Sequence, residues 1–262
     1  MTGNDRRPTI AVLGLGEAGG AFARDLLVAG AAVRGYDPAV AAPDGVVETT
    51  SEAEAATGAD LVLSANSSAA AREALRAGAG AVAPHAAWAD LNTASPATKR
   101  ELDSLAEHHG VTFADVAIMA PVPGTGLRTP MLACGRAARQ VVDVLNPLGA
   151  QVAVAEGGAG LAATQKLLRS VFFKGMSAAV VEALEAARAA GHEQWLRENI
   201  AAELAAAGES TMDRMVRGTH RHAVRRTAEM AAAAEMLTEL GVEPAVATAS
   251  RDLLARIAHQ HD

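Results

Sequence analysis

Cysteine is almost absent from this chain of 262 residues, because Cys134 is the only one. A lone thiol cannot form a disulfide within the chain, and such a composition is typical of proteins from reducing compartments. Apolar stretches are short, since no uncharged run approaches the roughly 18 residues that span a bilayer. The first eight residues are polar and charged and lack the apolar segment of a signal peptide. These absences predict a cytoplasmic protein without a membrane partner.

Aromatic residues and positive charge are scarce as well. Aromatics make up 3% of the chain, and its net charge is -7 at pH 7. An acidic chain argues against a general nucleic-acid binder, although it allows a local basic pocket for an anionic substrate. Half of the residues are apolar, so the chain can bury a core, in which abundant alanine favours closely packed helices. This length suits one large or two small domains.

A glycine-rich turn follows the first apolar run of the sequence. Residues 10–13 are long enough for one buried parallel strand, and residues 17–29 have a helical pattern. Between them, Gly14, Gly16 and Gly19 form a Gly-x-Gly-x-x-Gly motif. The first glycine allows a tight turn, the second lets a pyrophosphate approach, and the third lets the helix pack on the strand. We therefore expect this turn to present N–H groups to a dinucleotide.

The next predicted strand, residues 32–36, leads into Asp37. This carboxylate comes roughly 20 residues after the glycines, where the motif places the acidic residue that binds a ribose 2′-hydroxyl. Its charge would repel the 2′-phosphate of NADP, so NAD is the expected cofactor. Pro38 stands where NADP-binding proteins often have arginine, and Arg34 is expected to point away from the site. NADP is retained as the alternative.

Predicted strands and helices alternate as far as residue 154. Ser51 and Glu54 have the spacing of a capping box, and Ser95 is expected to cap a helix that begins at Pro96. The remaining predicted strands are residues 46–47, 60–64, 88–91, 111–118, 129–134 and 151–154. The helices between them are residues 51–58, 69–77, 96–108 and 136–145. This alternation predicts an α/β Rossmann domain with a doubly wound, mostly parallel sheet.

No strand is expected after the glycine-rich stretch 156–160. A proline-free helical pattern runs from residue 161 to 190, longer than most globular helices and typical of a helix that joins two domains. The helices expected after it are residues 193–207, 210–217, 219–240 and 244–259. The glycines expected to end helices are Gly191, Gly208, Gly218 and Gly241. Two domains follow: a dinucleotide-binding Rossmann domain at 1–155 and an all-helical substrate and dimerisation domain at 156–262.

Candidate acids and bases lie in the helical part, because a dinucleotide domain supplies a nicotinamide but no proton carrier. Lys166, Ser170 and Lys174 succeed one another at intervals of four residues and share one helix face. Lysine acts as a general base or acid when burial lowers its pKa, and a solvated helix face is the alternative reading. Asn66 follows the strand 60–64, at the edge where open α/β sheets bind ligands.

Basic side chains cluster at residues 218–229. His222, Arg225, Arg226 and Glu229 have the spacing of one helical stripe. This stripe could receive a carboxylate or phosphate, or it could form a helix surface or a salt-bridged dimer contact, and spacing leaves these readings open. No metal site is expected, because no His-Glu-x-x-His spacing occurs.

Together these residues resemble the β-hydroxyacid dehydrogenase superfamily, which includes 6-phosphogluconate and 3-hydroxyisobutyrate dehydrogenases. Residues 14–19 match its cofactor motif, and residues 90–96 look like its strand-end segment beside nicotinamide and substrate. Lys166 matches its catalytic lysine, whereas Ser170 stands where the family usually has asparagine. Residues 219–230 are similar to a loosely characterised phosphogluconate-dehydrogenase-like branch with its own helical domain.

The resemblance implies hydride transfer between NAD(P) and a small hydroxy acid or related alcohol. Lys166 would be the general acid and base, Asn92 and Thr93 would position the substrate, and Ser170 would bind its hydroxyl. The residues then expected at the cofactor are Gly14, Leu15, Gly16, Glu17, Ala18, Gly19, Asp37, Asn66 and Asn92. The substrate is expected to be anionic.

One departure from the family concerns the loop that binds the substrate carboxylate through a Ser-Gly-Gly backbone. Here Met119, Ala120 and Pro121 match it, and Pro121 and Pro123 have no N–H to donate. We hypothesise that anion binding has moved to other side chains. The residues considered for substrate binding are thus Met119, Ala120, Lys174, His222, Arg225 and Arg226.

Three other functions are weighed against this one. An imine reductase-like enzyme resembles the same superfamily, although Lys166 counts against it. A decarboxylating, phosphogluconate-like activity would need more phosphate ligands than we can assign, and a non-catalytic cofactor-binding scaffold would not need Lys166. The helical half is expected to form a homodimer, as relatives complete their sites across subunits, unless its helices close on one another.

Overall fold

The computed structural model describes residues 7–260. They form two compact units, of which the first ends at Arg169 and the second begins at Ser170. Most of the polar N-terminal start therefore lies outside the described residues. No helix within the described range is both long enough and apolar enough to cross a membrane.

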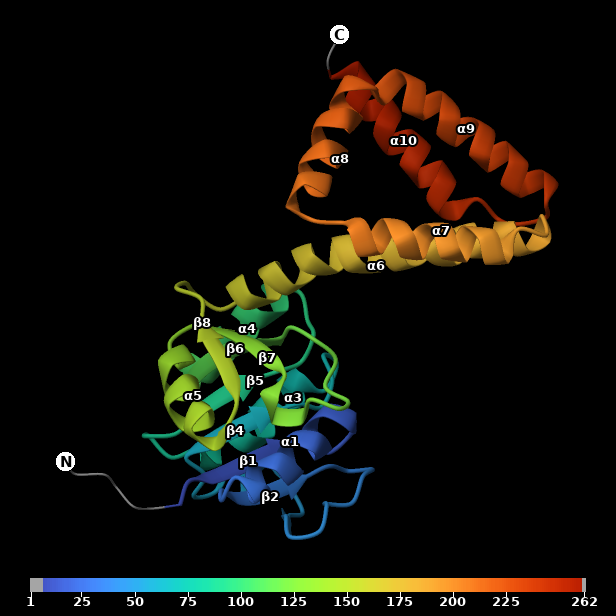
Figure 1. The fold of residues 1–262 in the computed structure, drawn as a ribbon. Coiled ribbons are helices and arrows are strands. Elements are labelled where there is room, and N and C mark those ends of the chain that lie inside the picture. The colour runs from blue at the N-terminus through green and yellow to red at the C-terminus, as the bar shows by residue number, and fades with distance from the viewer. Residues whose placement is uncertain (1–6, 261–262) are drawn as a thin grey trace. The chain divides into compact units, whose positions relative to one another are not determined.

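A sheet of eight strands forms the centre of the first unit (Figure 1). Its order is β3-β2-β1-β4-β5-β6-β7-β8, and the neighbouring strands are parallel except for the antiparallel pair β6 and β7. The strands are β1 (Thr9–Leu13), β2 (Ala32–Tyr36), β3 (Val47–Glu48), β4 (Leu61–Ser64), β5 (Ala87–Asp90), β6 (Thr112–Ile118), β7 (Pro130–Cys134) and β8 (Gln151–Val154). The predicted doubly wound, mostly parallel sheet is confirmed.

Helices cover both faces of this sheet. They are α1 (Glu17–Val28), α2 (Glu52–Ala56), α3 (Ala71–Gly78), α4 (Pro96–His108) and α5 (Ala138–Leu145). Phe22 of α1 and Leu145 of α5 belong to one apolar layer, and Leu102 of α4 belongs to the other. Along β1 the side chains alternate between these layers, as the period of two in a strand requires. Both faces of β1 are therefore buried.

Two predicted helix starts can be compared with their hydrogen bonds. Ser95 Oγ accepts the N–H of Thr98 at 3.1 Å, so the predicted cap of α4 is confirmed. Ser51 Oγ likewise accepts the N–H of Glu54 at 3.1 Å. The prediction of a reciprocal hydrogen bond from the Ser51 N–H to the Glu54 side chain is wrong, however. The Glu54 carboxylate instead accepts the N–H and hydroxyl of Thr50, both at 2.7 Å. These bonds lower the pKa of Glu54.

The chain reverses its direction of travel across the sheet between β1 and β4. From β1 it proceeds outward to β2 and β3, and then β4 pairs with the other side of β1. Carboxyl ends of strands on either side of such a switch point flank a crevice that binds ligands. The Gly14 turn follows β1, Asn66 follows β4 and Asn92 follows β5. The topology therefore brings the predicted cofactor residues to one edge.

The second unit is helical, as predicted. Its elements are the later part of α6 (Leu161–Ala189), α7 (Glu193–Ala206), α8 (Glu209–Arg221), α9 (Ala223–Glu239) and α10 (Ala245–His259). Helices α9 and α10 lie side by side in Figure 1. A small core joins Ala186 of α6, Leu237 of α9 and Ala247 of α10.

The division between the units differs from the boundary expected at residue 155. It falls inside α6, because the first turns of this helix are bonded to β6 and β7 of the first unit. The first turns of α6, with Lys166, therefore belong to the Rossmann unit.

Two of the four glycines predicted to end helices do so. Gly191 and Gly241 follow α6 and α9 with φ of +77° and +73°. Gly208 instead precedes α8 in an extended conformation, and Gly218 lies inside α8. A Cβ at Gly218 would lie 3.3 Å from the guanidinium of Arg226, so glycine leaves room there for a side chain from α9. The helical pattern is interrupted at His222 instead, which lies between α8 and α9.

Candidate functional site

The turn after β1 places each motif glycine in a different environment. Gly14 has φ of +92°, and a Cβ on it would lie 2.5 Å from Asn66 Cα. A Cβ on Gly19 would lie 1.8 Å from Gly14 O, so only glycine lets α1 approach the turn this closely. Gly16 is exposed, with no atom within 4 Å of where its Cβ would be. Open space in front of a helix N-terminus fits a pyrophosphate.

Asp37 holds this turn against the end of β2. Its Oδ2 accepts the N–H of Leu15 at 2.8 Å, and its Oδ1 accepts the N–H groups of Ala39 at 2.8 Å and Val40 at 3.0 Å. The half-buried carboxylate is therefore oriented by three backbone donors. The guanidinium of Arg34 donates to Thr57 O, just after α2 and at the edge where the strands begin. Arg34 thus points away from the Asp37 edge, as predicted.

Asn92 joins the ends of β4 and β5. Its buried Nδ2 lies 2.8 Å from Asp90 Oδ2, 2.9 Å from Asn66 Oδ1 and 3.2 Å from Ser64 Oγ. An amide nitrogen among acceptors is a satisfied donor. Asn66 and Asn92 are thus brought together as expected, and the Asn92 nitrogen is committed to the protein itself.

Lys166 meets the residue that follows Asn92. Its Nζ donates a hydrogen bond to Thr93 Oγ1 at 2.9 Å, from the second turn of α6. Lys166 is half-buried and Thr93 is exposed. Both side chains line a small cavity together with Asn92, Lys99 and Asp115. An amine, a hydroxyl and an amide therefore converge at the carboxyl end of β5.

The start of α6 is fixed by side chains from other elements. Asp115 Oδ2, on β6, accepts the N–H groups of Gly160 at 3.0 Å and Ala163 at 3.1 Å. The Sγ of Cys134 accepts the N–H of Ala162 at 3.2 Å. A carboxylate at a helix N-terminus is favoured by the helix dipole. Burial raises the pKa of Cys134, so its thiol stays protonated and can donate to Asp115, whose Oδ2 is 3.6 Å away.

A buried lysine links the two carboxylates of this region. Lys99 of α4 has its Nζ 2.6 Å from Asp90 Oδ1 and 3.0 Å from Asp115 Oδ1, and these three side chains are at most 1% exposed. Sequence reasoning missed this cluster. Asp115 could have drawn attention as the charged residue of a mostly apolar predicted strand, but nothing in the sequence pairs it with Asp90 or Lys99.

The substrate-binding candidates fall into two groups. Met119 and Ala120 are half-buried at the start of the loop after β6, and the N–H of Met119 donates to Pro130 O at 2.8 Å. The second group belongs to the second unit and consists of Ser170, a catalytic candidate, with Lys174, His222, Arg225 and Arg226.

Three residues of the predicted basic stripe lie on α9, and the fourth, His222, comes just before this helix. His222 is the residue between α8 and α9. Arg225 pairs with Glu229 at 3.1 Å, whereas Arg226 Nη1 donates to Thr219 Oγ1 of α8 at 2.6 Å. Arg226 and Glu229 also line a cavity of about 400 Å³. Both arginines therefore already have partners within the helical unit.

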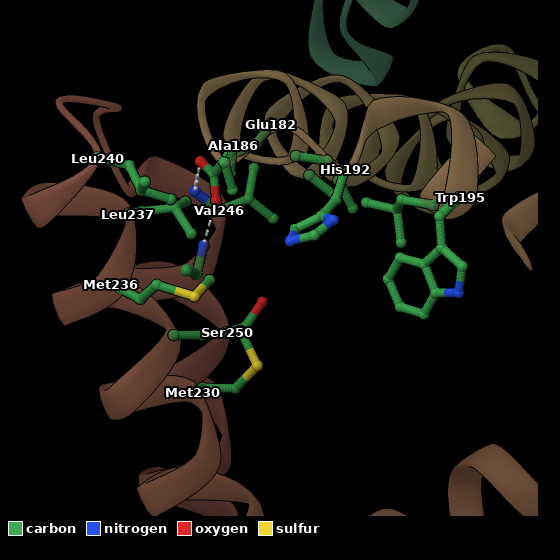
Figure 2. Close-up of a pocket in the computed structure, with 17 residues that line it drawn as sticks. Glu182, Ala186, His192, Trp195, Met230, Met236, Leu237, Leu240, Val246 and Ser250 are labelled. Carbon is green, nitrogen blue, oxygen red and sulfur yellow. Dashed lines mark hydrogen bonds between the residues drawn. The ribbon is translucent and has the colours of Figure 1, made fainter.

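The second unit contains a larger, apolar cavity of about 530 Å³ (Figure 2). It is lined mostly by apolar side chains of α6, α7, α9 and α10, among them Trp195, Met230 and Met236. Glu182 accepts the N–H groups of Val246 at 2.6 Å and Ala247 at 2.8 Å, and so caps α10. The residues with acid-base chemistry line the smaller cavity beside Thr93 instead. Among residues 7–260, no group of three His, Cys, Asp or Glu side chains could hold a metal.

Comparisons with known proteins identify the family and the fold. Residues 9–157 match the NAD binding domain of 6-phosphogluconate dehydrogenase, and residues 187–257 match a domain of unknown function, DUF1932. A probable 3-hydroxyisobutyrate dehydrogenase of Mycobacterium bovis is 30% identical over 192 residues, which are 70% of this chain and 65% of that protein. The matched part of the chain thus spans just under two thirds of that relative.

Solved structures resemble nearly the whole chain. The conserved protein MTH1747, of unknown function and structurally similar to 3-hydroxyacid dehydrogenases, is 30% identical, with a TM-score of 0.62 over 96% of this chain and 98% of its own. An imine reductase of Streptomyces aurantiacus shares the fold at 22% identity, with a TM-score of 0.78 over 95% of this chain and 93% of its own. With its glycine turn, Asp37 and the matched residues 9–157, the chain belongs to the family that carries the NAD binding domain of 6-phosphogluconate dehydrogenase.

Proposed function

We propose that this protein is an NAD(P)-dependent oxidoreductase that acts on a small hydroxy acid or related alcohol, with Lys166 as its general acid and base. The observation that carries the proposal is the 2.9 Å hydrogen bond from Lys166 Nζ to Thr93 Oγ1. It holds an amine at the strand edge that also bears the glycine turn. The 3-hydroxyisobutyrate dehydrogenase relative supports the substrate class.

The first unit would hold the dinucleotide through side chains and backbone already described. The exposed Gly16 and the start of α1 would take the pyrophosphate, and Asp37 would take a ribose hydroxyl. The remaining expected contacts are Gly14, Leu15, Glu17, Ala18, Gly19, Asn66 and Asn92. When bound, the nicotinamide supplies or accepts the hydride. Asp37 favours NAD over NADP because its charge repels a 2′-phosphate.

Lys166 carries the proton in this proposal. In oxidation, its neutral Nζ accepts the proton of the substrate hydroxyl, and in reduction the ammonium returns it. Thr93 orients the amine by accepting its hydrogen. Asn92 offers its carbonyl oxygen to the ligand, since its nitrogen bonds Asp90 and Asn66. Ser170, four residues after Lys166, binds the substrate hydroxyl.

An imine reductase-like activity is the alternative. The observation that favours it is the loop after β6, where Pro121 and Pro123 offer no N–H to a substrate carboxylate. A substrate without a carboxylate would not need such donors. Turnover of cyclohexanone and allylamine with NADPH or NADH, but not of 3-hydroxyisobutyrate with NAD⁺, would decide for this alternative.

We also propose a homodimer formed by the helical unit. Neither α7 nor α8 has a buried residue. The large exposed apolar side chains on them are Trp195, Leu204, Met212, Met215 and Val216. Apolar helix faces of this kind are typical of surfaces that a partner covers.

Substitution of Lys166 tests the proposed chemistry. We expect Lys166→Met to lower kcat by about 10²- to 10⁴-fold, because the proton carrier is lost. NADH affinity, measured by fluorescence titration, should stay the same. Gln165→Met, at the exposed neighbouring position, is the matched control and should keep full activity.

The same experiment distinguishes catalysis from a cofactor-binding scaffold. Unchanged turnover of 3-hydroxyisobutyrate by Lys166→Met would refute the role of Lys166. Binding of NADH without turnover of either substrate by the unmodified protein would favour the scaffold. Titrations with NADPH beside NADH test the NAD preference, which fails if NADPH binds more tightly.

A further inference from the structure

Lysine is rare in this chain, and two of its three lysines lie at the candidate site. They are Lys99 and Lys166, and Lys174 is the third. Lys99 is 1% exposed, and its Nζ also donates to the backbone oxygen of Asp90 at 2.8 Å. Lysine is almost never fully buried unless it is paired. Its position therefore needs an explanation beyond packing.

The explanation begins with two carboxylates that lie side by side. Asp90 on β5 and Asp115 on β6 are register partners in parallel strands, and both are 0% exposed. Like charges at neighbouring positions of a sheet repel each other, and burial strengthens the repulsion. The ammonium of Lys99 contacts one oxygen of each. Its positive charge lies between the two carboxylates and offsets their repulsion.

The second oxygen of each carboxylate holds a different part of the site. Asp90 Oδ2 accepts from Asn92 Nδ2 at 2.8 Å, which fixes the segment that leads into Thr93. Asp115 Oδ2 accepts the N–H groups of Gly160 and Ala163, which fixes the start of the helix that carries Lys166. Lys99 therefore joins the two segments whose side chains meet at Thr93 and Lys166.

We propose that Lys99 is a positioning residue for Lys166: it holds the two segments together and sets the charge beside the Lys166 amine. This inference rests on the proposed function, in which Lys166 carries a proton. Lys99 and Asp115 line the same cavity as Lys166, Asp90 faces Lys99 from β5, and Arg169 follows on α6 itself. Loss of Lys99 makes this neighbourhood more negative and favours the ammonium form of Lys166. Loss of the Asp90 charge has the opposite effect.

Titration of the lysine side chains tests this directly. Protein labelled with lysine carrying ¹³C at Cε gives one signal from each of the three lysines, and Lys166→Met assigns that of Lys166. In Lys99→Met, we expect the titration midpoint of Lys166 to rise by about one pH unit, as for one charge lost at a poorly solvated site. In Asp90→Asn it should fall, and in the double variant it should return toward the unmodified value.

The control is Arg72→Met, which removes one positive charge from an exposed ion pair with Glu101 and should leave the midpoint unchanged. If Lys99→Met does not fold, Asp90→Asn still decides, because Lys99 keeps Asp115 as its partner in that variant. An unmoved Lys166 midpoint in folded Lys99→Met or Asp90→Asn overturns the proposal. A shift of equal size in Arg72→Met overturns it as well.

Turnover provides a separate reading. If the proposed function holds, the pH limb of kcat for 3-hydroxyisobutyrate oxidation moves with the Lys166 midpoint, while KM stays within about twofold. If no substrate turns over, the proposed function fails, yet the NMR titration still tests the influence of Lys99. The two proposals can therefore fail independently.

Discussion

Single side chains at the carboxyl edge of the sheet divide into those that we propose to face a ligand and those that hold others in place. Thr93 and Lys166 belong to the first group, since their side chains are hydrogen-bonded to each other at the small cavity beside Asn92. Lys99 and Asp115 belong to the second, since their charged atoms are directed at buried partners. Asn92 belongs to the second group through its nitrogen, which bonds Asp90 and Asn66, and we propose that its oxygen belongs to the first.

The anion-binding hypothesis can be tested at two single arginines. We expect Arg225→Ala or Arg226→Ala to raise KM for 3-hydroxyisobutyrate by about tenfold or more with little change in kcat, because a charge-assisted hydrogen bond is lost. Steady-state kinetics measure both constants. Arg217→Ala removes a comparable exposed arginine paired with Asp213 and should change neither. The hypothesis fails if KM is unchanged in both variants.

The sequence identified candidate site residues wherever their spacing or a motif marked them. Lys166 and Asn92 were named in advance, and the structure brings Thr93 and Lys166 into hydrogen-bond contact. Asp115 and Lys99 were not named, because a buried ion pair depends on which strand lies beside which. Only the pairing of β5 with β6 makes neighbours of Asp90 and Asp115.

Among the helices, α6 shows how a distant residue can start an element. No acidic residue lies in its own first turn, and Asp115 of β6 supplies the carboxylate that accepts its first N–H groups. By contrast, α4 is capped locally by Ser95, and that cap was read from the sequence. Local caps are therefore predictable, whereas a cap from another strand requires the fold.

The turn between α6 and α7 is held by ion pairs whose strength depends on pH. Glu193 accepts from Arg188 Nε and Nη2, both at 2.8 Å, and from Arg197 Nη2 at 3.0 Å. The hydrogen bond from Arg188, followed by that from Arg197, lowers the pKa of Glu193 to about 2. A lowered pKa stabilises the folded state above the ordinary range of a glutamate, and this contribution disappears as the pH falls toward 2.

We therefore expect Glu193→Gln to exchange amide hydrogens faster around residues 188–197 at neutral pH. The difference from the unmodified protein should shrink as the pH falls from about 5 toward 2, because protonation then removes the same charge from Glu193. Hydrogen exchange followed by mass spectrometry measures it. Glu198→Gln is the control, since Glu198 accepts only from the neutral Gln194 among its described bonds. A difference that does not depend on pH would contradict this account.

The chain taken as a whole combines a well-packed α/β unit with a helical unit that covers little of its own apolar surface. The first unit has two extensive apolar layers, whereas the core of α6, α9 and α10 is small. Trp195 of α7 is 66% exposed and Met215 of α8 is 58% exposed. Exposed apolar side chains of this kind are typical of surfaces that a partner covers, and a second copy of the chain is the partner that we propose.

Sedimentation velocity tests the homodimer. We expect the unmodified protein to sediment as a dimer and Trp195→Glu or Met215→Glu to shift it toward monomer, because each would place a charge in the apolar interface of the proposed dimer. Val28→Glu is the control, because Val28 is 89% exposed on α1 of the first unit. A monomer at every concentration of the unmodified protein would show that the helices close without a partner.

Local pattern was enough for the nucleotide-binding turn, the alternation of strands and helices, and the helical second half. Each of these depends on residues within a few positions of one another. Contacts across strands and helices decide three other features. These are the end of α8 before His222, the attachment of the first turns of α6 to the sheet, and the ion cluster around Lys99. Those contacts join residues such as Asp115 and Gly160, which are far apart in the chain and close only after folding. No periodicity along the sequence encodes such a meeting, so the buried charges around Lys166 emerged from the fold alone.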